Sequence, residues 1–406
     1  MDEQRPGPRR VVITGMGVLS GPAVGVDEFW DALVGPPPAA THRKLEGFDP
    51  RRWLDRRRAQ RTDRFAQAAV ASAALAHDDA GAPAIDPERT AVVYGVGNGG
   101  LLTIMAECSA FERMGPAGAS ELAGVMLMTN AGAANIAFHL GIHGTVYAVA
   151  GGCASGTAAL VEAYRLLRHG DADVVYTGGS EACLASDEIA GDPVPAGLVK
   201  LRVHTTDDVV RPFDADRSGF IFSEGAAALR FETLEAAQAQ GARIYAEVLA
   251  GANTVDGHDL ITPAPRGSGL QRAFRQALRQ AGADESQVGY VNVHGSGTPT
   301  NDQVESDAIT DVFRADGQVG PAVSSVKAVT GHPGGAAGAV EAVATVLAMQ
   351  RRTVPPTRFV RTVDPAIEVD VVTEPRPWEP GLAFSTSMGL GGQNAAILFG
   401  PAPETP

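Results

Sequence analysis

The chain contains 406 residues, of which 44% are hydrophobic and 20% charged, a composition that supports the core of one large or two medium globular domains. Its formal net charge of -14 argues against nucleic acid as a partner, because binding a polyanion requires an excess of Lys and Arg. No stretch approaches the roughly 18 apolar residues of a membrane span, and the N-terminus lacks the apolar segment of a signal peptide. We therefore expect a soluble, cytoplasmic protein that binds no membrane.

In chain order, the predicted elements occur twice, which indicates an internal duplication. An apolar strand that ends in glycine occurs at 9–21 and again at 243–257. A buried strand that enters a glycine-rich loop occurs at 88–100 and at 287–299. A glycine-flanked reactive residue before a helical pattern occurs at 151–170 and at 331–350. Strands that alternate with helices predict an α/β architecture. We expect two similar halves, residues 1–242 and 243–406, whose reactive residues face one another across the junction.

The segment 51–65, RRWLDRRRAQRTDRF, is basic within an acidic chain. It is either a solvated helix face or a docking patch for an acidic protein, since complementary charge steers partners together. The arginines concerned are Arg51, Arg52, Arg56, Arg57, Arg58, Arg61 and Arg64.

The three cysteines, Cys108, Cys153 and Cys183, form no C-x-x-C pair and leave an odd count. Neither a disulfide framework nor a zinc site is predicted, and we expect no bound metal. Cys108 and Cys183 are interpreted as small structural side chains, the usual role of an unpaired buried cysteine.

Cys153 stands in AVAGGCASGTAAL, between an apolar strand and the start of a helical pattern. The positive end of a helix dipole and free backbone N–H groups favour thiolate over thiol, so we expect a lowered pKa and a nucleophile. The glycines beside it leave room for a substrate. The alternative is again a small core hydrophobe.

Two histidines occupy glycine-rich turns after predicted strands, His294 in VNVHGSGTPTND and His332 in VKAVTGHPGG. Functional residues of α/β folds often lie at such strand ends, although most single histidines are surface or core residues without a catalytic role. Lys327 precedes His332 by five residues in a chain with three lysines and thirty arginines, which suggests that a compact charge is needed there. The glycine loop in 384–399 offers backbone N–H groups for an oxyanion.

These motifs, with VVITGMG, TGGSEA, RPFDADRSGFIFSEGAAAL and SMGLGGQNA, resemble the β-ketoacyl-acyl carrier protein synthases in order and spacing over essentially the whole chain. The resemblance is to stand-alone ketosynthases with a Cys-His-His centre, from dissociated fatty acid or polyketide systems. It implies a thiolase-like α/β fold whose two halves form a five-layered αβαβα sandwich. It also implies no cofactor beyond the phosphopantetheine arm that carries the substrates.

The resemblance implies a decarboxylative Claisen condensation. Cys153 would take an acyl chain from a carrier protein's phosphopantetheine thiol, a form of covalent catalysis. His294 and His332 would hold malonyl-acyl carrier protein and promote its decarboxylation, so that the carbanion equivalent attacks the acyl group and yields 3-ketoacyl-acyl carrier protein.

The resemblance also assigns supporting roles. Backbone N–H groups of Cys153 and Met388 match the oxyanion hole, Lys327 matches the lysine that supports the second histidine electrostatically, and Glu341 matches an acid buried behind the site. Ser296 and Thr298 match residues that bind the pantetheine arm, and Met388 and Leu390 match the acyl gate. The residues that match the carrier-protein docking region are Arg57, Arg58, Arg61 and Arg64. One expected partner is an acyl carrier protein. The other is a second subunit, which is either a copy of this chain in a homodimer or a ketosynthase-like chain-length partner in a heterodimer.

Several positions depart from the family's pattern. Serine replaces threonine at Ser296, and Met388 and Leu390 stand where phenylalanine is usual, which predicts a looser gate. Gly152 favours a polyketide-type pathway over housekeeping fatty acid synthesis. The segment 110–130 departs where relatives build the dimer interface and the pocket floor.

Three other functions are alternatives to condensation. A thiolase needs a second cysteine in the late glycine loop, and SMGLGGQNA has none. A chain-length partner lacks the nucleophile, whereas Cys153 is present. An acyltransferase or decarboxylase that uses Cys153 without condensation stays open, because the altered gate would affect the coupling of the two half-reactions.

Overall fold

The computed structural model describes residues 9–189, 191–314 and 320–403. Its main sheet joins two five-stranded halves through antiparallel pairing of β1 with β7. The strands of the N-terminal half are β1 (Val11–Ser20), β3 (Thr90–Gly95), β4 (Val146–Val149), β5 (Val174–Glu181) and β6 (Gly225–Thr233). Those of the C-terminal half are β7 (Ala246–Val255), β8 (Val288–Asn292), β9 (Ala322–Ser324), β13 (Leu382–Gly389) and β14 (Gln393–Pro401).

The two halves have the same strand order and orientation. The order is β4-β3-β5-β6-β1 in the first and β9-β8-β13-β14-β7 in the second. In each, the first three strands are parallel and the last two pair antiparallel. The short strands are β2 (Ala23–Val24), β10 (Thr353–Val354), β11 (Asp370–Val371) and β12 (Arg376–Pro377). The predicted boundary at 242/243 falls in the connection between α9 (Leu234–Ala239) and β7.

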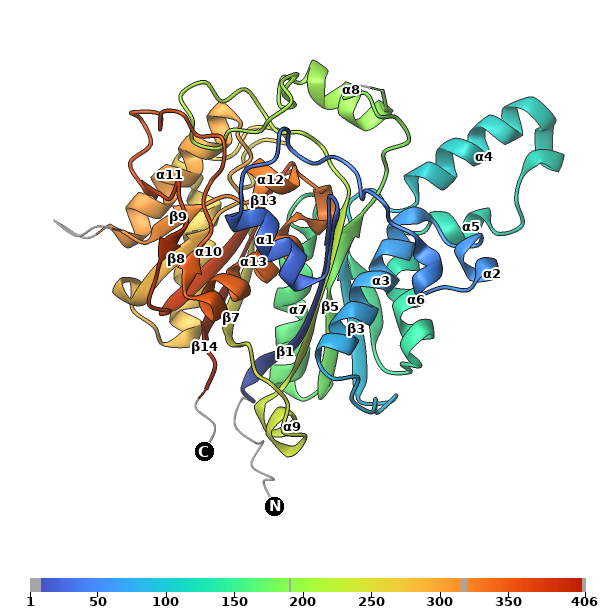
Figure 1. Cartoon of the computed structure of the whole chain (residues 1–406), viewed down its shortest axis with the longest axis horizontal. Helices are drawn as coiled ribbons and strands as arrows, with labels where there is room; N and C mark the ends of the chain where they lie inside the picture. The colour runs from blue at the N-terminus through green and yellow to red at the C-terminus, as the bar shows by residue number, and fades with distance from the viewer. Residues whose placement is uncertain (1–8, 190, 315–319, 404–406) are drawn as a thin grey trace.

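Helices form three layers around the two half-sheets (Figure 1). α3 (Arg64–Asp79) and α6 (Ala131–Leu140) cover the outer face of the first half, and α10 (Ser268–Ala281) and α11 (Pro299–Phe313) lie on the outer side of the second. Between the halves, α7 (Ser155–His169) packs against α13 (Ala337–Arg351). The expected five-layered α/β architecture is confirmed. The remaining helices are α1 (Val26–Val34), α2 (Arg56–Ala59), α4 (Leu101–Met114), α5 (Ala123–Leu127), α8 (Pro193–Lys200) and α12 (Lys327–Thr330).

Small residues allow the two central helices to approach one another. A Cβ on Gly156 would lie 2.8 Å from the backbone nitrogen of Ala339, and a Cβ on Gly338 would lie 2.0 Å from the hydroxyl of Thr157. Both distances are below any real contact of a methyl group, so larger side chains would push the halves apart. Because α7 starts beside Cys153 and α13 carries Glu341, this packing sets the spacing between the two halves of the site.

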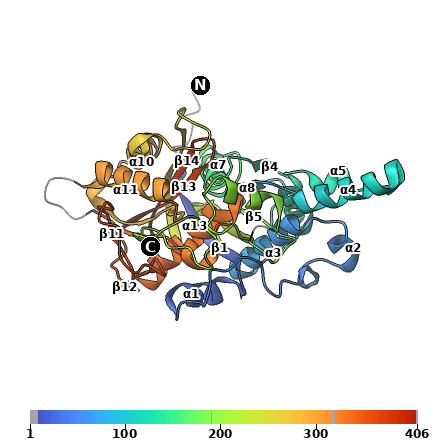
Figure 2. The same ribbon diagram turned by 90° about the horizontal axis from the view of Figure 1, so that it is seen from above.

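One end of the molecule carries an unusual apolar surface. α4 and the turn after it project from the body in both views (Figures 1 and 2). Several large hydrophobic side chains on α4, α5, α6 and their connections are exposed: Ile104, Phe111, Met114, Val125, Met128 and Phe138. In the described parts of the chain, no helix combines the length and the apolar character needed to cross a membrane.

Candidate active site

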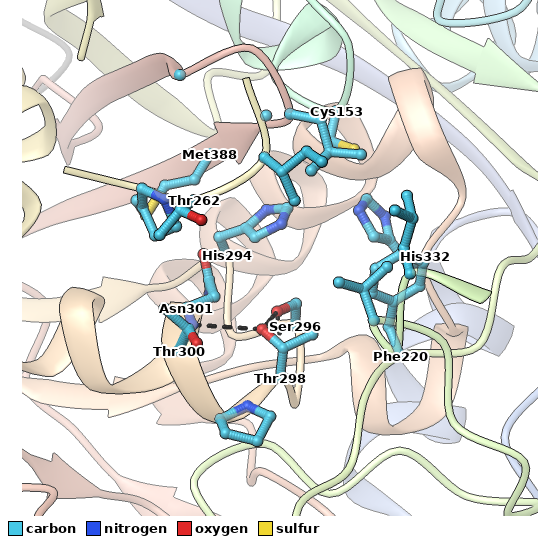
Figure 3. Close-up of a pocket in the computed structure, with 18 of the residues that line it drawn as sticks. Cys153, Phe220, Thr262, His294, Ser296, Thr298, Thr300, Asn301, His332 and Met388 are labelled. Atoms are coloured by element: carbon cyan, nitrogen blue, oxygen red, sulfur yellow. Dashed lines mark hydrogen bonds between the residues drawn. The ribbon is translucent and has the colours of Figure 1, made fainter. Parts of the chain in front are cut away.

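The predicted nucleophile and both predicted histidines line one pocket of about 330 Å³. Cys153 approaches it from the start of α7, His294 from the end of β8, and His332 from the loop between α12 and α13. Figure 3 shows the three side chains turned toward a common space. Four further predicted residues line the same pocket: Ser296, Thr298, Met388 and Leu390.

A tight turn presents Cys153 between β4 and α7. Gly152 has a φ of 56°, in the left-handed region that glycine adopts without strain. The hydroxyl of Ser155 accepts a hydrogen bond from the Gly151 N–H at 2.9 Å and lies 2.6 Å from the Gly152 carbonyl oxygen, to which it donates. The backbone therefore gives Gly152 a structural role in the turn that carries Cys153.

The thiol of Cys153 does not have the lowered pKa that the sequence suggested. Burial raises its pKa to about 11, although the Lys327 charge and a hydrogen bond from the Leu390 backbone N–H act in the opposite direction. Cys153 precedes the N-cap residue Ala154, and a helix dipole acts strongly only within the first turn. The resting thiol is thus protonated, and its proton must leave as the sulfur attacks.

His294 is held as a neutral hydrogen-bond donor. The Lys327 ammonium donates to the His294 carbonyl oxygen at 2.6 Å and lies 3.3 Å from Nδ1. Because an ammonium only donates, Nδ1 must accept, which leaves the proton on Nε2. Burial, Lys327 and His332 together hold the pKa of His294 well below its usual value.

His332 is positioned by its backbone and by aromatic contacts. Its N–H donates to the Ile221 carbonyl at 2.8 Å, and its carbonyl accepts from the Ser223 N–H at 3.0 Å. Its ring meets those of His294 and Phe220 edge to face, with centroids 5.0 and 4.8 Å apart. Burial, with the charge of Lys327, holds the pKa of His332 well below its usual value, so this imidazole is also neutral.

The predicted Lys327 and Glu341 form a buried ion pair behind the histidines. Lys327 is fully buried, and its ammonium contacts the carboxylate of Glu341 on α13. Burial raises the pKa of Glu341, while the ammonium opposes that rise. The direct contacts of Lys327 are with His294, which the sequence did not predict. Its charge also acts on His332, in keeping with the expected electrostatic role toward the second histidine.

Ser296 and Thr298 place two hydroxyl groups on the pocket wall, with their oxygens 3.0 Å apart (Figure 3). Thr298 also caps α11, because its hydroxyl accepts a hydrogen bond from the Asn301 N–H. Both residues are buried from the outer surface and line the pocket, so their hydroxyls can hydrogen-bond a molecule bound there.

The glycine loop after β13 supplies a backbone donor from a different residue than predicted. Met388 is buried and pairs with Asn394 of β14, whereas Leu390 lies in the turn and is 42% exposed. The N–H that reaches the Cys153 sulfur belongs to Leu390. This contact moves the second candidate oxyanion donor from Met388 to Leu390.

Sequence comparisons agree with this site. The N-terminal domain of β-ketoacyl synthase matches residues 36–237, and its C-terminal domain matches residues 245–361. The 3-oxoacyl-[acyl-carrier-protein] synthase 2 of Staphylococcus aureus strain N315 is 36% identical over 411 residues, covering 96% of this chain and 98% of the relative. The chain belongs to the β-ketoacyl synthase family. A relative of the same description from Synechocystis is 33% identical and covers the same shares.

Solved ketosynthase structures share the whole fold. The ishigamide ketosynthase/chain length factor has a TM-score of 0.88 and 31% identity, covering 98% of this chain and 100% of that one. A β-ketoacyl synthase from Burkholderia phymatum has a TM-score of 0.88 and 30% identity, covering 97% and 100%. A type II polyketide ketosynthase in complex with its acyl-carrier protein has a TM-score of 0.85 and 26% identity, again covering 97% and 100%. The chain is thus a thiolase-like ketosynthase, an enzyme of the 3-ketoacyl-acyl carrier protein synthase class.

The arginines of this ketosynthase's basic segment have different environments. Arg57 and Arg61 are exposed, and Arg58 lies over the ring of Phe138 at 4.6 Å. Arg64, by contrast, binds the buried carboxylate of Glu224 at 3.0 Å. Arg64 is therefore a structural residue, which corrects its assignment to docking. No residue of the segment 51–65 lines the pocket.

Two buried carboxylates that the sequence analysis missed hold the catalytic loops. Glu305 accepts hydrogen bonds from the backbone N–H groups of His294 and Gly295, both at 2.7 Å. Glu181 accepts from Gly97 and from Gly335, each at 3.1 Å, and so ties the turn after His332 to the N-terminal half. TGGSEA and HGSGTPTND pointed to these regions, but neither motif shows which backbone groups a carboxylate will reach.

Proposed function

We propose that this ketosynthase condenses an acyl chain bound to Cys153 with malonyl-acyl carrier protein, releasing carbon dioxide and 3-ketoacyl-acyl carrier protein. The observation that carries the proposal is the meeting of one thiol with two neutral imidazoles, His294 and His332, in a single pocket. The thiol serves the first half-reaction, and the imidazoles serve the second.

In the first half-reaction, the Cys153 sulfur attacks the thioester carbonyl of an acyl carrier protein. The N–H groups of Cys153 and Leu390 are the proposed oxyanion donors. The tetrahedral intermediate expels the pantetheine thiolate, which takes up the proton that Cys153 loses. The raised pKa of the Cys153 thiol requires this proton transfer to accompany the attack.

In the second half-reaction, the malonyl thioester loses carbon dioxide and an enolate forms. Neutral imidazoles donate N–H groups to the thioester oxygen, where negative charge develops, and so stabilise the enolate. Its α-carbon attacks the acyl-Cys153 carbonyl. The intermediate then expels the Cys153 thiolate, which takes a proton from the solvent, and the new carbon–carbon bond lies in the 3-ketoacyl product.

The pocket wall suits the arm that delivers both substrates. Phosphopantetheine carries two amide groups on a narrow chain, and the hydroxyls of Ser296 and Thr298 are placed to hydrogen-bond such groups. The proposal needs no metal. The part of the chain that the structure describes contains no cluster of His, Cys, Asp or Glu suited to a metal ion.

The proposed macromolecular partners are an acyl carrier protein and a second ketosynthase-like chain. Exposed Arg57 and Arg61 provide positive charge for an acidic carrier protein. The apolar side chains on α4 and α5 are suited to burial against a second subunit, because such a surface is costly to leave in water. Likeness to a ketosynthase/chain length factor and to a type II polyketide ketosynthase supports a polyketide-type pathway and a heterodimer.

The test is to incubate the protein with an acylated and a malonylated carrier protein and to identify products by intact-protein mass spectrometry. Wild-type protein should form 3-ketoacyl carrier protein, and Cys153→Ala should form neither acyl-enzyme nor this product. Release of carbon dioxide without a condensed product would instead identify a decarboxylase. Product formation unchanged by Cys153→Ala would overturn the proposal.

A further inference from the structure

A third buried histidine, His204, lies beside the two that line the pocket. It follows α8 in a segment that pairs with Phe220: the Thr205 N–H donates to the Phe220 carbonyl at 2.9 Å, and the Phe220 N–H donates to the Val203 carbonyl at 3.0 Å. Phe222, two residues further, forms a β-bridge with His332. Three short segments thus form a small ladder that ends at the catalytic loop.

Hydrogen bonds fix both nitrogens of His204. Nδ1 lies 2.7 Å from the Thr205 carbonyl oxygen, which only accepts, so Nδ1 carries the proton. Nε2 accepts from the Phe222 N–H at 3.0 Å, and Phe222 is itself buried. Removal of this acceptor would leave a buried backbone N–H without its partner.

A continuous row of rings connects His204 with the pocket. Its ring lies 5.9 Å from that of Phe220, and the Phe220 ring meets His332 edge to face at 4.8 Å. Phe220 and His332 both line the pocket, whereas His204 lies behind them. Figure 3 shows Phe220 next to His332, on the side away from Cys153.

The ring of His332 relies on packing for its orientation. Its Nδ1 has no hydrogen-bond partner among the described residues. Its backbone pairs with the segment that His204 holds, and its ring rests on Phe220 and His294. An imidazole that must aim one N–H at a developing oxyanion needs its ring angle fixed by packing.

We propose that His204 is a positioning residue that, through Phe220 and the Phe222 N–H, sets the ring angle of His332 for decarboxylation of the malonyl unit. This inference rests on the proposed function. The proposal predicts an effect on decarboxylation and not on acylation. The contacts of His204 lead to His332, whereas the turn that carries Cys153 is held by other contacts.

The experiment compares His204→Leu with His204→Gln and measures the two half-reactions apart. Acylation of Cys153 is followed by intact mass with an acyl carrier protein alone, and carbon dioxide release with malonyl carrier protein alone. His204→Leu should slow decarboxylation about tenfold to a hundredfold, as expected for a misaligned catalytic group, while acylation stays within about threefold of wild type. Gln offers an oxygen near the position of Nε2 and should restore most of the decarboxylation rate.

Matched variants complete the test. His77→Gln replaces a histidine on α3 whose Nδ1 bonds the Tyr176 hydroxyl, and it should leave both rates unchanged. If His204→Leu does not fold, Phe220→Leu, which removes the ring that His204 supports, should show the same selective loss. Equal loss in both half-reactions, unchanged decarboxylation, or no rescue by Gln would overturn the inference. A wild-type protein that releases no carbon dioxide would refute the proposed function instead.

Discussion

The ammonium of Lys327 contacts His294 at two points, its carbonyl oxygen and the ring nitrogen Nδ1, at 2.6 and 3.3 Å. A buried positive charge beside an imidazole disfavours its protonation, and the bond to Nδ1 directs the remaining proton to Nε2. Lys327 therefore sets the tautomer of a catalytic histidine and acts together with burial to keep it neutral.

Replacing Lys327 with Met should remove decarboxylation and destabilise the fold. Without the ammonium, His294 loses the partner that fixes its tautomer, and Glu341 becomes a buried carboxyl without a counter-charge, which costs about 3–5 kcal/mol in similar cases. The double variant Lys327→Met/Glu341→Gln should recover thermal stability but not carbon dioxide release. Recovery of both by the double variant would show that Lys327 acts only through the fold.

The reactivity of Cys153 toward iodoacetamide should rise steadily with pH. Because burial raises the pKa of the thiol to about 11, the thiolate fraction should still be increasing at about pH 10. The Lys327 charge lowers this pKa, so Lys327→Met should make alkylation slower at any given pH. Mass-spectrometric alkylation rates test this; a plateau below about pH 8 would mean that the helix N-terminus outweighs burial.

Both catalytic imidazoles should stay neutral well into acid. Their pKa values lie below the usual 6.5, so single-turnover decarboxylation should be flat between about pH 8 and pH 6 and fall only at lower pH. The unfolded chain binds these protons near pH 6.5 and the folded chain does not, so the free energy of unfolding should also decrease as the pH falls below about 6.5. A decarboxylation rate that already halves at about pH 6.5 would contradict neutral, buried histidines.

The contact between the central helices should tolerate no added methyl group. Gly156→Ala would place a Cβ 2.8 Å from the Ala339 backbone and should cost about 1–3 kcal/mol of unfolding free energy. Gly197→Ala on α8 is the matched control, because its Cβ would meet nothing within 4 Å. Chemical denaturation measures both; equal stability of the two variants would refute the packing argument.

Charge reversal of Arg57 and Arg61 should weaken use of a carrier protein. We expect a higher KM for acyl carrier protein, less dependence on salt, and little change with a free pantetheine thioester, since only the carrier protein presents an acidic surface. Arg279→Glu, an exposed change at the end of α10, serves as the control. Equal loss with carrier-bound and free substrates would remove the docking role.

Local sequence motifs predicted much of this site because its residues sit on glycine turns at strand ends. Cys153 and His294 follow strands β4 and β8, and His332 follows β9 after the short helix α12; equivalent positions in a duplicated fold converge at the junction of the halves. The repeated pattern of strand, glycine loop and helix in the sequence indicates the duplication.

Contacts between distant segments could not be predicted in the same way. The direction of the Cys153 pKa depends on how much protein encloses the sulfur. Likewise, Arg64 belongs by composition to a basic run, but only the fold brings the buried carboxylate of Glu224 against it. The proposed role of His204 could not be predicted from the sequence either, because it depends on contacts with Phe220 and Phe222 that only the fold creates.

The most direct measurement of the central claim is a single turnover of acyl-enzyme. Cys153 is first loaded with an isotopically labelled acyl group, excess acyl donor is removed, and malonyl carrier protein is added. The account predicts that the label moves from the enzyme to 3-ketoacyl carrier protein in wild type, and remains on Cys153 in His294→Ala and His332→Ala. Transfer of the label by these variants, or carbon dioxide release in wild type with the label still on Cys153, would contradict it.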